Sequence, residues 1–379
     1  MKIGVDTFGC DHGKSGLGSY LYSFVQNLPS ASDFEFELFG SGIDKFTYLG
    51  DNSSLNYVEV SLPETLGAQR FWHTFQSKKF LKNCGYDLVI YPAAARMIPL
   101  KFQIPGICIV NDVPSSILKN CDSLWTKFYL KKSLSNADCI VASSNFIKKD
   151  LERIGINPKK IEVVYNGIDH ALFYNSEDFN SDSEYVNIKP FAIKRPYIIY
   201  ASRMQNKEKK HLELIKAFEI FKKKTNLPHR LVIAGSDGPS SDAIHKACLS
   251  SEYASDIFVT GYFPHADFAR LYANASACVF PSVNEGVGLP VLEAMACGLP
   301  VACSSEGSLK EITGSNALFF NSSDPSQIAC AIEKILLDSK LRNELKIAGL
   351  NWTKRFTWER TVSSILKIAE EIIKSKNQN

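Results

Sequence analysis

Short apolar runs typical of β-strands alternate with amphipathic stretches typical of helices along almost all of the 379-residue chain. This alternation predicts parallel sheets whose strands are joined by crossover helices. In the first half the predicted strands are 2–5, 34–39, 58–61, 88–91, 107–110, 139–142 and 162–165. In the second half they are 197–201, 230–234, 257–260, 277–280, 300–303 and 317–320, with helices at 209–224, 265–273 and 357–374.

A polar stretch at 176–194 separates the two halves of this alternation and carries Asn, Asp, Ser and Pro with little periodicity. A chain of 379 residues is longer than a single domain with one hydrophobic core usually is. We therefore interpret the stretch as a linker between two domains, 1–185 and 190–356. Two successive Rossmann-like domains predict a cleft between them. Ligands of such domains bind at the carboxyl ends of the strands, where loops and helix N-termini converge.

Composition excludes several classes of protein. With 45% hydrophobic and 22% charged residues the chain is typical of globular proteins, and its net charge of +3 implies no large nucleic-acid footprint. No apolar run approaches the ~20 residues of a membrane span, and the N-terminus predicts a strand rather than a signal peptide. Ten cysteines lack C-x-x-C pairs, and Cys108, Cys139, Cys278 and Cys303 fall in apolar runs. We therefore expect reduced cysteines in a cytosolic protein, with no zinc site and no other metal ligand set.

Two glutamates stand eight residues apart in the run E-G-V-G-L-P-V-L-E. Glu285 lies in a loop broken by Gly286 and Gly288, whereas Glu293 lies in a short helix that Pro290 can begin. A loop that ends at a helix N-terminus attracts anions through free backbone N–H groups and the helix dipole. The pattern suits a phosphorylated sugar. The alternative is a glycine-rich turn before a buried helix with an incidental glutamate.

The longer run E-G-V-G-L-P-V-L-E-A-M-A-C-G-L-P-V resembles the Glu–seven residues–Glu signature of the family 4 retaining glycosyltransferases. The resemblance implies that Glu293 binds the ribose of the nucleotide and that Glu285 lies at the donor sugar. It also implies donor contacts from the residues that follow Glu285, namely Gly286, Val287, Gly288 and Leu289.

A second glycine-rich segment, K-S-G-L-G-S-Y-L-Y, follows the first predicted strand and opens a helix. Gly16 and Gly18 would let the backbone approach a phosphate or sugar closely. Leu21 stands where a dinucleotide fingerprint needs its third glycine, which disfavours NAD. The segment resembles the glycine-rich loop that closes over donor or acceptor in the family; the alternative is a tight turn.

Two cations follow the strand at 197–201. The guanidinium of Arg203 can bind two phosphate oxygens at once, and the ammonium of Lys209 supplies a further positive charge. A diphosphate needs such cations when no metal ion neutralises its charge. The alternative is the solvated start of a charged helix. The run resembles the Arg…Lys motif of the family, with Lys209 as the best match and Lys207 and Lys210 as alternatives. By the resemblance, Arg203, Lys209 and Glu285 form the catalytic group.

Three further positions are assigned by the resemblance. Asn111 stands where the family usually has His before Asp112, and an amide can bind a sugar hydroxyl but cannot carry a proton charge near neutral pH. Asp112 orients a hydroxyl in this interpretation, or forms a turn before Pro114. The backbone of Tyr262 is expected to contact the base, while its side chain packs rather than stacks.

Taken over nearly the whole chain, the resemblance implies the GT-B fold, two Rossmann-like domains facing across a cleft, with helix 357–379 completing the first. It implies a retaining, metal-independent transfer of a hexose-type sugar from a nucleotide sugar to a glycan or lipid-linked hydroxyl. The associated pathway is surface polysaccharide or lipopolysaccharide synthesis. The expected location is the cytoplasm, with peripheral contact at the inner membrane face, and no cofactor is expected.

Each of two stretches rich in basic and aromatic residues, 70–82 and 124–132, could form a helix that lies on a membrane surface. We favour the alternative, in which each helix packs an apolar stripe into the protein core and exposes its basic face to water. Two other classes of function remain open. One is a nucleotide-sugar epimerase or phosphorylase on the same fold. The other is a catalytically silent sugar-nucleotide-binding partner protein, which Asn111 makes conceivable.

Overall fold

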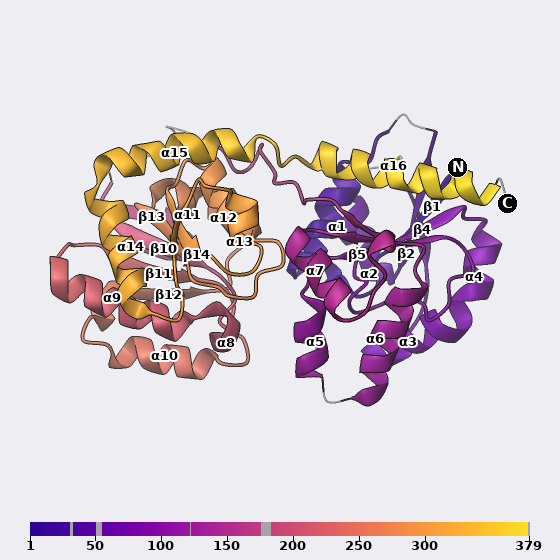
Figure 1. Cartoon of the computed structure of the whole chain (residues 1–379), viewed down its shortest axis with the longest axis horizontal. Coiled ribbons are helices and arrows are strands. Elements are labelled where there is room, and N and C mark those ends of the chain that lie inside the picture. The colour runs from indigo at the N-terminus through magenta and orange to yellow at the C-terminus, as the bar shows by residue number, and fades with distance from the viewer. Residues whose placement is uncertain (31–32, 51–54, 122, 176–182, 378–379) are drawn as a thin grey trace. The chain divides into compact units, whose positions relative to one another are not determined.

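The computed structural model describes residues 1–30, 33–50, 55–121, 123–175 and 183–377 (Figure 1). The chain divides into two compact units. The N-terminal unit comprises Met1–Gly167 and Phe356–Asn379, and the C-terminal unit comprises Ile168–Arg355. Each unit contains a parallel sheet covered by helices, so the predicted α/β class with two Rossmann-like domains is confirmed.

The sheet of the N-terminal unit is wholly parallel, with strand order β3-β2-β1-β4-β5-β6-β7. Its strands are β1 (Lys2–Asp6), β2 (Glu35–Gly40), β3 (Asn56–Glu59), β4 (Leu88–Tyr91), β5 (Gly106–Val110), β6 (Cys139–Ala142) and β7 (Ile161–Val163). The central strands read as unbroken apolar runs because helices bury both faces of a parallel sheet. Neighbouring residues Val89 and Ile90 accordingly pack into two different core clusters.

The helices of this unit are η1 (Asp11–Gly13), α1 (Gly16–Gln26), α2 (Gly42–Leu49), α3 (Leu66–Phe71), the π-helix η2 (Trp72–Gln76), α4 (Ser77–Cys84), α5 (Pro114–Asn120), α6 (Leu124–Asn136), α7 (Asn145–Arg153), η3 (Pro158–Lys160) and α16 (Trp358–Asn377). The apolar stripe of α16 packs into the core beside α1, with Ile365 and Ala369 fully buried. The ring of Trp358 lies 5.3 Å from that of Tyr20. The C-terminal helix therefore completes the N-terminal unit.

The C-terminal unit has a second parallel sheet, with strand order β12-β11-β10-β13-β14-β15. Its strands are β10 (Tyr197–Ala201), β11 (Arg230–Ala234), β12 (Ile257–Gly261), β13 (Ala277–Phe280), β14 (Val301–Ser304) and β15 (Leu318–Phe320). Its helices are α8 (Asn206–Lys209), α9 (His211–Thr225), α10 (Ser241–Ser250), η5 (Ala254–Asp256), η6 (His265–Asp267), α11 (Phe268–Asn274), α12 (Leu289–Ala296), α13 (Leu309–Thr313), α14 (Pro325–Leu337) and α15 (Ser339–Thr353). The predicted strands of both halves match the observed ones to within two residues at each end.

Strand order reverses once in each sheet, at β1/β4 and at β10/β13. Loops that leave the carboxyl ends of two strands at such a point diverge to opposite faces of the sheet and leave a crevice for a ligand. The glycine-rich loop follows β1. Arg203 follows β10 and Glu285 follows β13, so both flank the reversal in the C-terminal sheet.

The predicted linker at 176–194 is wrong for its second part. Strands β8 (Tyr185–Ile188) and β9 (Phe191–Lys194) form an antiparallel hairpin in the C-terminal unit. Its alternating apolar side chains are buried, and the ring of Phe191 lies 5.6 Å from that of Phe258. Residues 176–182 lie outside the described residues, and the division between the units falls at Gly167, before the predicted linker.

Candidate active site

Glu285 and Lys209 form an ion pair at the carboxyl edge of the C-terminal sheet. Lys209 Nζ lies 2.5 Å from Glu285 Oε2, and Ser282 Oγ donates to the same oxygen over 2.9 Å. The lysine side chain is 20% exposed and the glutamate side chain 15%. The pair is therefore largely shielded from water, which strengthens the interaction between the charges relative to a surface pair.

A break between two helices places Lys209. It is the last residue of α8, and α9 begins at His211 because Lys210 between them has a left-handed backbone with φ of 55°. The hydroxyl of Tyr200 donates to the Lys209 carbonyl over 2.7 Å and fixes this corner to β10. Of the three lysines that the sequence left open, Lys210 pairs with Glu213 and Lys207 is exposed, whereas Lys209 reaches Glu285.

Backbone hydrogen bonds hold the Glu285 loop against its neighbours. The amide of Val283 donates to the Glu208 carbonyl over 2.9 Å, and Asn284 Nδ2 donates to Glu208 Oε1 over 3.1 Å. The amide of Ser308 donates to the Glu285 carbonyl over 2.9 Å. Two neighbouring segments, at Glu208 and at Ser308, therefore determine the position of the loop, which suits a group that must meet a ligand in one orientation.

Arg203 is exposed beyond the end of β10. Its Nε makes a long hydrogen bond of 3.4 Å to the Asp237 carbonyl, and among the described residues it has no carboxylate partner. An exposed guanidinium without a counter-ion is available to fork two phosphate oxygens.

The helix α12 begins at Leu289, one residue before Pro290, so the predicted start was one residue late. Gly288 precedes it with φ of 72°, a left-handed conformation that favours glycine. No side chain caps this end of the helix. The loop from Gly286 through Val287 to Leu289 thus leads into a helix N-terminus that is open to an anion.

Glu293 lies five residues into α12 and is 6% exposed. Its Oε1 lies 2.9 Å from His265 Nε2. Burial lowers the pKa of His265, but the hydrogen bond to Glu293 and the charges of Glu293 and Asp169 outweigh burial and raise the pKa above its usual value. His265 also lies 5.2 Å from the ring of Phe173, so it links α12 to the start of the unit.

The sequence interpretation did not include His265 among the site residues. It stands 28 positions before Glu293, at the start of η6, and no motif connects the two. The packing of α11, which follows His265, against α12, which carries Glu293, brings them together. A histidine close after a strand end was the only signal in the sequence.

Replacing His265 with Gln is expected to change how the stability of the protein depends on pH. Because the folded state raises the pKa of His265, the ion pair with Glu293 stabilises the folded state fully below the unfolded value of about 6.5. This contribution disappears as pH rises through the raised folded pKa. Thermal unfolding of the wild type and of H265Q between pH 6 and 9 measures the difference; parallel curves for the two proteins would contradict it.

The predicted packing of the Tyr262 side chain is wrong. The side chain is 69% exposed, because β12 ends at Gly261 with φ of 72° and turns the next residue outward. An exposed aromatic ring beside the sheet edge can cover a planar group. The expected contact of the Tyr262 backbone with the base of the nucleotide stays a prediction.

Within the N-terminal unit, Ser15 caps α1 and its Oγ accepts from the Gly18 amide over 3.3 Å. A Cβ on Gly18 would lie 2.5 Å from Gly13 Cα, so the packing of the loop on itself requires glycine at this position. The approach of Gly18 to a ligand stays a prediction. Gly16 has open space around its Cα, and its approach to a ligand stays a prediction.

Asn111 follows β5, and its Oδ1 accepts from Asn166 Nδ2 over 2.9 Å. Within the part of the chain that the structure describes, Asn111 Nδ2 is buried without a hydrogen-bond partner. A buried amide donor of this kind is costly unless a ligand or water satisfies it. Asp112 lies 4.0 Å from Arg96 Nε, and α5 begins two residues later.

A polar network under the glycine-rich loop was not foreseen. His73 Nε2 lies 2.7 Å from Asp6 Oδ2, and His73 Nδ1 donates to the Gln69 carbonyl over 2.7 Å. Asp44 accepts from Thr7 Oγ1 over 2.6 Å, and burial raises the pKa of Asp44. Thr7 and Asp44 lie 37 residues apart and Asp6 and His73 lie 67 apart, so no local pattern could reveal these two pairs.

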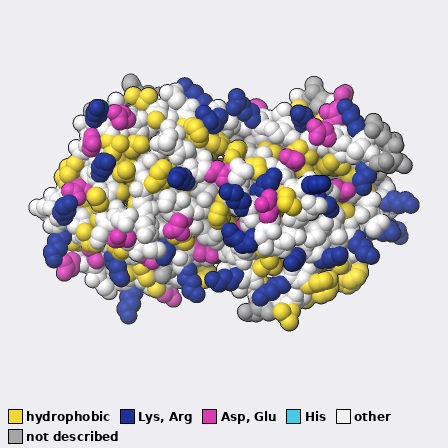
Figure 2. All heavy atoms as spheres, viewed as in Figure 1, with side chains coloured by type: hydrophobic (Ala, Val, Ile, Leu, Met, Phe, Trp, Pro, Cys, Tyr) yellow, Lys and Arg dark blue, Asp and Glu magenta, His cyan; other side chains and the backbone are white. Residues whose placement is uncertain are grey.

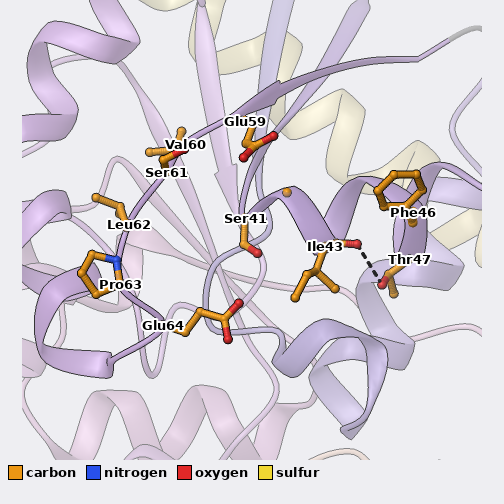
Figure 3. Close-up of a pocket in the computed structure, with 11 residues that line it drawn as sticks. Ser41, Ile43, Phe46, Thr47, Glu59, Val60, Ser61, Leu62, Pro63 and Glu64 are labelled. Atoms are coloured by element: carbon orange, nitrogen blue, oxygen red, sulfur yellow. Dashed lines mark hydrogen bonds between the residues drawn. The ribbon is translucent and has the colours of Figure 1, made fainter.

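A pocket of about 840 Å³ opens in the N-terminal unit, beyond the carboxyl ends of β2 and β3 (Figure 3). One wall comes from the start of α2 and the other from the segment after β3. The lining residues are Ser41, Gly42, Ile43, Phe46, Thr47, Glu59, Val60, Ser61, Leu62, Pro63 and Glu64. Thr47 lies against the glycine-rich loop, since a Cβ on Gly13 would lie 2.8 Å from its methyl group.

The described residues contain no group of three or more His, Cys, Asp or Glu arranged to hold a metal ion. None of their helices is long and apolar enough to cross a membrane. All ten cysteines are free, and Cys108, Cys139, Cys278 and Cys303 are buried.

Comparison with known proteins decides the family. Residues 182–352 match the family described as Glycosyl transferases group 1, and residues 14–172 match Glycosyltransferase Family 4. The O-antigen chain mannosyltransferase B of Escherichia coli is 32% identical over 95% of this chain and 97% of its own. The chain is a family 4 glycosyltransferase. An uncharacterized glycosyltransferase of Methanocaldococcus jannaschii is 27% identical over 78% of each chain.

Solved structures show that this glycosyltransferase has the GT-B fold. The sucrose-phosphate synthase of Thermosynechococcus elongatus has a TM-score of 0.72 at 19% identity and covers 99% of this chain and 100% of its own. Anabaena HepE in complex with UDP and glucose has a TM-score of 0.76 at 18% identity and covers 98% of this chain and 100% of its own. The predicted family and fold are confirmed.

Proposed function

We propose that this glycosyltransferase moves a sugar from a nucleoside-diphosphate sugar to a hydroxyl of a glycan or lipid-linked acceptor, with retention of anomeric configuration, in surface polysaccharide synthesis. The observation that carries the proposal is the shielded Lys209–Glu285 pair at the β10/β13 reversal, where Arg203 follows the end of β10. The name of the E. coli relative supports an O-antigen type of glycan, and makes mannose the first sugar to test. The binding of UDP and glucose by HepE supports a nucleotide-bound donor.

The C-terminal unit offers a suitable partner for the diphosphate and for the ribose of the nucleotide-sugar donor. Arg203 forks the diphosphate, while Lys209 gives one N–H to Glu285 and keeps others for phosphate oxygens. The uncapped start of α12 adds backbone N–H groups to the same charge. Glu293 uses one oxygen for His265, and its other oxygen is assigned to a ribose hydroxyl.

The proposed reaction takes place on one face of the sugar. The bond from the anomeric carbon to the leaving phosphate oxygen breaks, and a bond to the acceptor oxygen forms on the same face. The acceptor proton passes to the departing diphosphate, whose charge Arg203 and Lys209 stabilise. Glu285 positions Lys209 and the donor sugar instead of attacking carbon, because an ion-paired carboxylate is a poor nucleophile. Asn111 Nδ2, buried and without a partner among the described residues, supplies a hydrogen bond to a sugar hydroxyl.

Transfer assays test the proposal. A thermal-shift screen across UDP-, GDP- and dTDP-sugars, with mannose first, identifies the donor. Transfer from that donor to an acceptor glycan is then followed by NMR, which reads the anomeric configuration of the product. Inverted product would contradict the mechanism. An isomerised donor sugar without acceptor, phosphate-dependent cleavage of a glycan, or donor binding without transfer would contradict the reaction itself.

Removing divalent metal ions is expected to leave turnover within about twofold of the untreated rate. The reason is that Arg203, Lys209 and the start of α12 supply the positive charge that a metal would otherwise supply. Initial rates with and without EDTA measure the effect. Loss of activity that added Mg²⁺ or Mn²⁺ restores would overturn the metal-independent mechanism.

We further propose that the pocket beside α2 holds acceptor sugar residues. Apolar side chains such as Phe46, which is 82% exposed, can cover the C–H face of a sugar, and Glu59 and Glu64 can accept from its hydroxyls (Figure 3). Two carboxylates disfavour a phosphate ligand here. A lipid-linked acceptor of this kind would place the enzyme at the cytoplasmic face of a membrane.

Replacing Phe46 with Ala is expected to raise the acceptor KM by about tenfold while the donor KM stays within about twofold, because only one aromatic contact is lost. Steady-state kinetics with each substrate varied in turn measure the two constants. Ile220→Ala is the matched control, since Ile220 is an exposed apolar residue of the C-terminal unit. An equal rise in both constants would contradict the assignment of the pocket.

A further inference from the structure

Six large apolar side chains of the N-terminal unit point into solvent from two helical segments. They are Leu66, Phe71 and Phe75 of α3 and η2, and Leu124, Trp125 and Phe128 of α6, with exposed fractions of 50, 55, 66, 81, 59 and 54%. We call these six residues the aromatic face. Exposed apolar groups of this size rarely gather on a globular surface without a binding role.

The two segments lie side by side, and each presents a pair of exposed rings. Their centroids lie 5.0 Å apart for Phe71 and Phe75, and 5.8 Å apart for Trp125 and Phe128. Arg70 joins the two segments: its Nη1 donates to Thr126 Oγ1 over 3.4 Å, and its guanidinium lies 5.5 Å from the ring of Tyr129. Figure 2 shows a hydrophobic area edged by Lys and Arg at the lower right, where Figure 1 places α3 and α6.

The same segments already contribute to the core through other residues. Trp72 of η2 and Leu81 of α4, which continues the first segment, are buried in one core cluster of the unit. Leu130 and Leu134 of α6 are buried in the same cluster. The aromatic face is therefore additional to what folding requires. Our sequence interpretation, a core stripe with a wet basic face, accounts for the buried residues but not for the exposed ones.

The helical segments that carry the aromatic face, together with α4, have charged side chains of a single sign. Residues 66–84 and 124–136 contain no Asp or Glu, but contain one Arg and six Lys: Arg70, Lys78, Lys79, Lys82, Lys127, Lys131 and Lys132. The structure gives none of these lysines a carboxylate partner within the described ranges. Apolar rings surrounded by unpaired lysines match the interface of an anionic bilayer, where rings enter the headgroup boundary and lysines meet lipid charge.

We propose that the aromatic face docks the N-terminal unit on a bilayer that contains anionic lipid. The purpose of this docking rests on the proposed function, because docking would hold the enzyme near a lipid-linked acceptor. A second copy of the chain is a poor occupant of the face, because a symmetric contact would bring the same lysines together and like charges repel. The docking itself needs no substrate.

Co-sedimentation of the full chain with vesicles tests the proposal. The protein is expected to bind vesicles of phosphatidylcholine with phosphatidylglycerol, to bind phosphatidylcholine alone at least about tenfold more weakly, and to be released by salt. The variant F75S/W125S is expected to lower binding by about tenfold or more, because two interfacial rings are lost. The variant K78Q/K79Q/K82Q is expected to weaken binding only when anionic lipid is present.

Matched controls lie in the C-terminal unit. I220S/L249S removes two exposed apolar residues and K216Q/K223Q removes two exposed lysines, and neither is expected to change vesicle binding. Transfer to a water-soluble acceptor is expected to be unchanged in F75S/W125S, which separates docking from catalysis. Equal binding with and without anionic lipid, no vesicle binding, or a dimer that F75S/W125S abolishes would overturn the proposal.

Discussion

Glu285→Gln is expected to lower kcat by about 10²–10³-fold, the effect of removing one preorganised charged group from a site that stabilises a transition state. The amide keeps the shape of the side chain but cannot neutralise Lys209, whose Nζ now lies 2.5 Å from Glu285 Oε2. Removing one partner leaves the other charge uncompensated in a shielded site. Transfer rates at saturating donor and acceptor measure the loss.

The double variant E285Q/K209M distinguishes a pair from two independent groups. If the carboxylate acts by positioning the lysine, the double variant should be little slower than the slower single variant, since the two losses are not additive. Glu306→Gln removes an exposed carboxylate in the same unit and is expected to keep the wild-type rate. Full activity of E285Q would refute the role of the pair.

Arg203→Ala is expected to weaken binding of the nucleoside diphosphate by about 2–3 kcal/mol, or roughly 30- to 150-fold, through loss of a charge-assisted contact. The guanidinium extends from the end of β10 with a single long hydrogen bond to Asp237, so its removal should not disturb the fold. Isothermal titration with the diphosphate measures the change, and affinity for the nucleoside without phosphates should stay constant.

Arg270→Ala provides the comparison, because Arg270 is exposed on α11 in the same unit. The Arg270→Ala variant should bind the nucleoside diphosphate with the affinity of the wild type. If R203A binds the diphosphate as tightly as the wild type does, the cation that holds the phosphates is another residue.

Local sequence was a good guide wherever one segment determines its own structure. The strand at 197–201 was predicted at its observed bounds because its five apolar residues are buried on both faces of a parallel sheet. The loop and helix around Glu285 and Glu293 were predicted because glycine, proline and periodicity act over a few residues. The stretch at 185–194 was misread, because short alternation in a polar setting gave too weak a signal for a hairpin.

The aromatic face shows a different limit. Periodicity reports that a helix is amphipathic, but stretches 70–82 and 124–132 each carry two apolar faces, and pattern alone does not say which one enters the core. The π-helix at Trp72–Gln76 also shifts the residues that follow it around the helix axis. Only the packed unit shows that Trp72 is buried while Phe75 is exposed.

By itself, the sequence determined the two-domain α/β class, the glycosyltransferase family and the segments that carry the candidate donor site. These follow from patterns within a single segment. The tertiary structure alone decided the partners: Lys209 with Glu285 across 76 positions, His265 with Glu293 across 28, and Asp6 with His73 across 67. The physical reason is that strand order and the packing of helices on the sheets, which no local pattern encodes, determine which distant side chains meet.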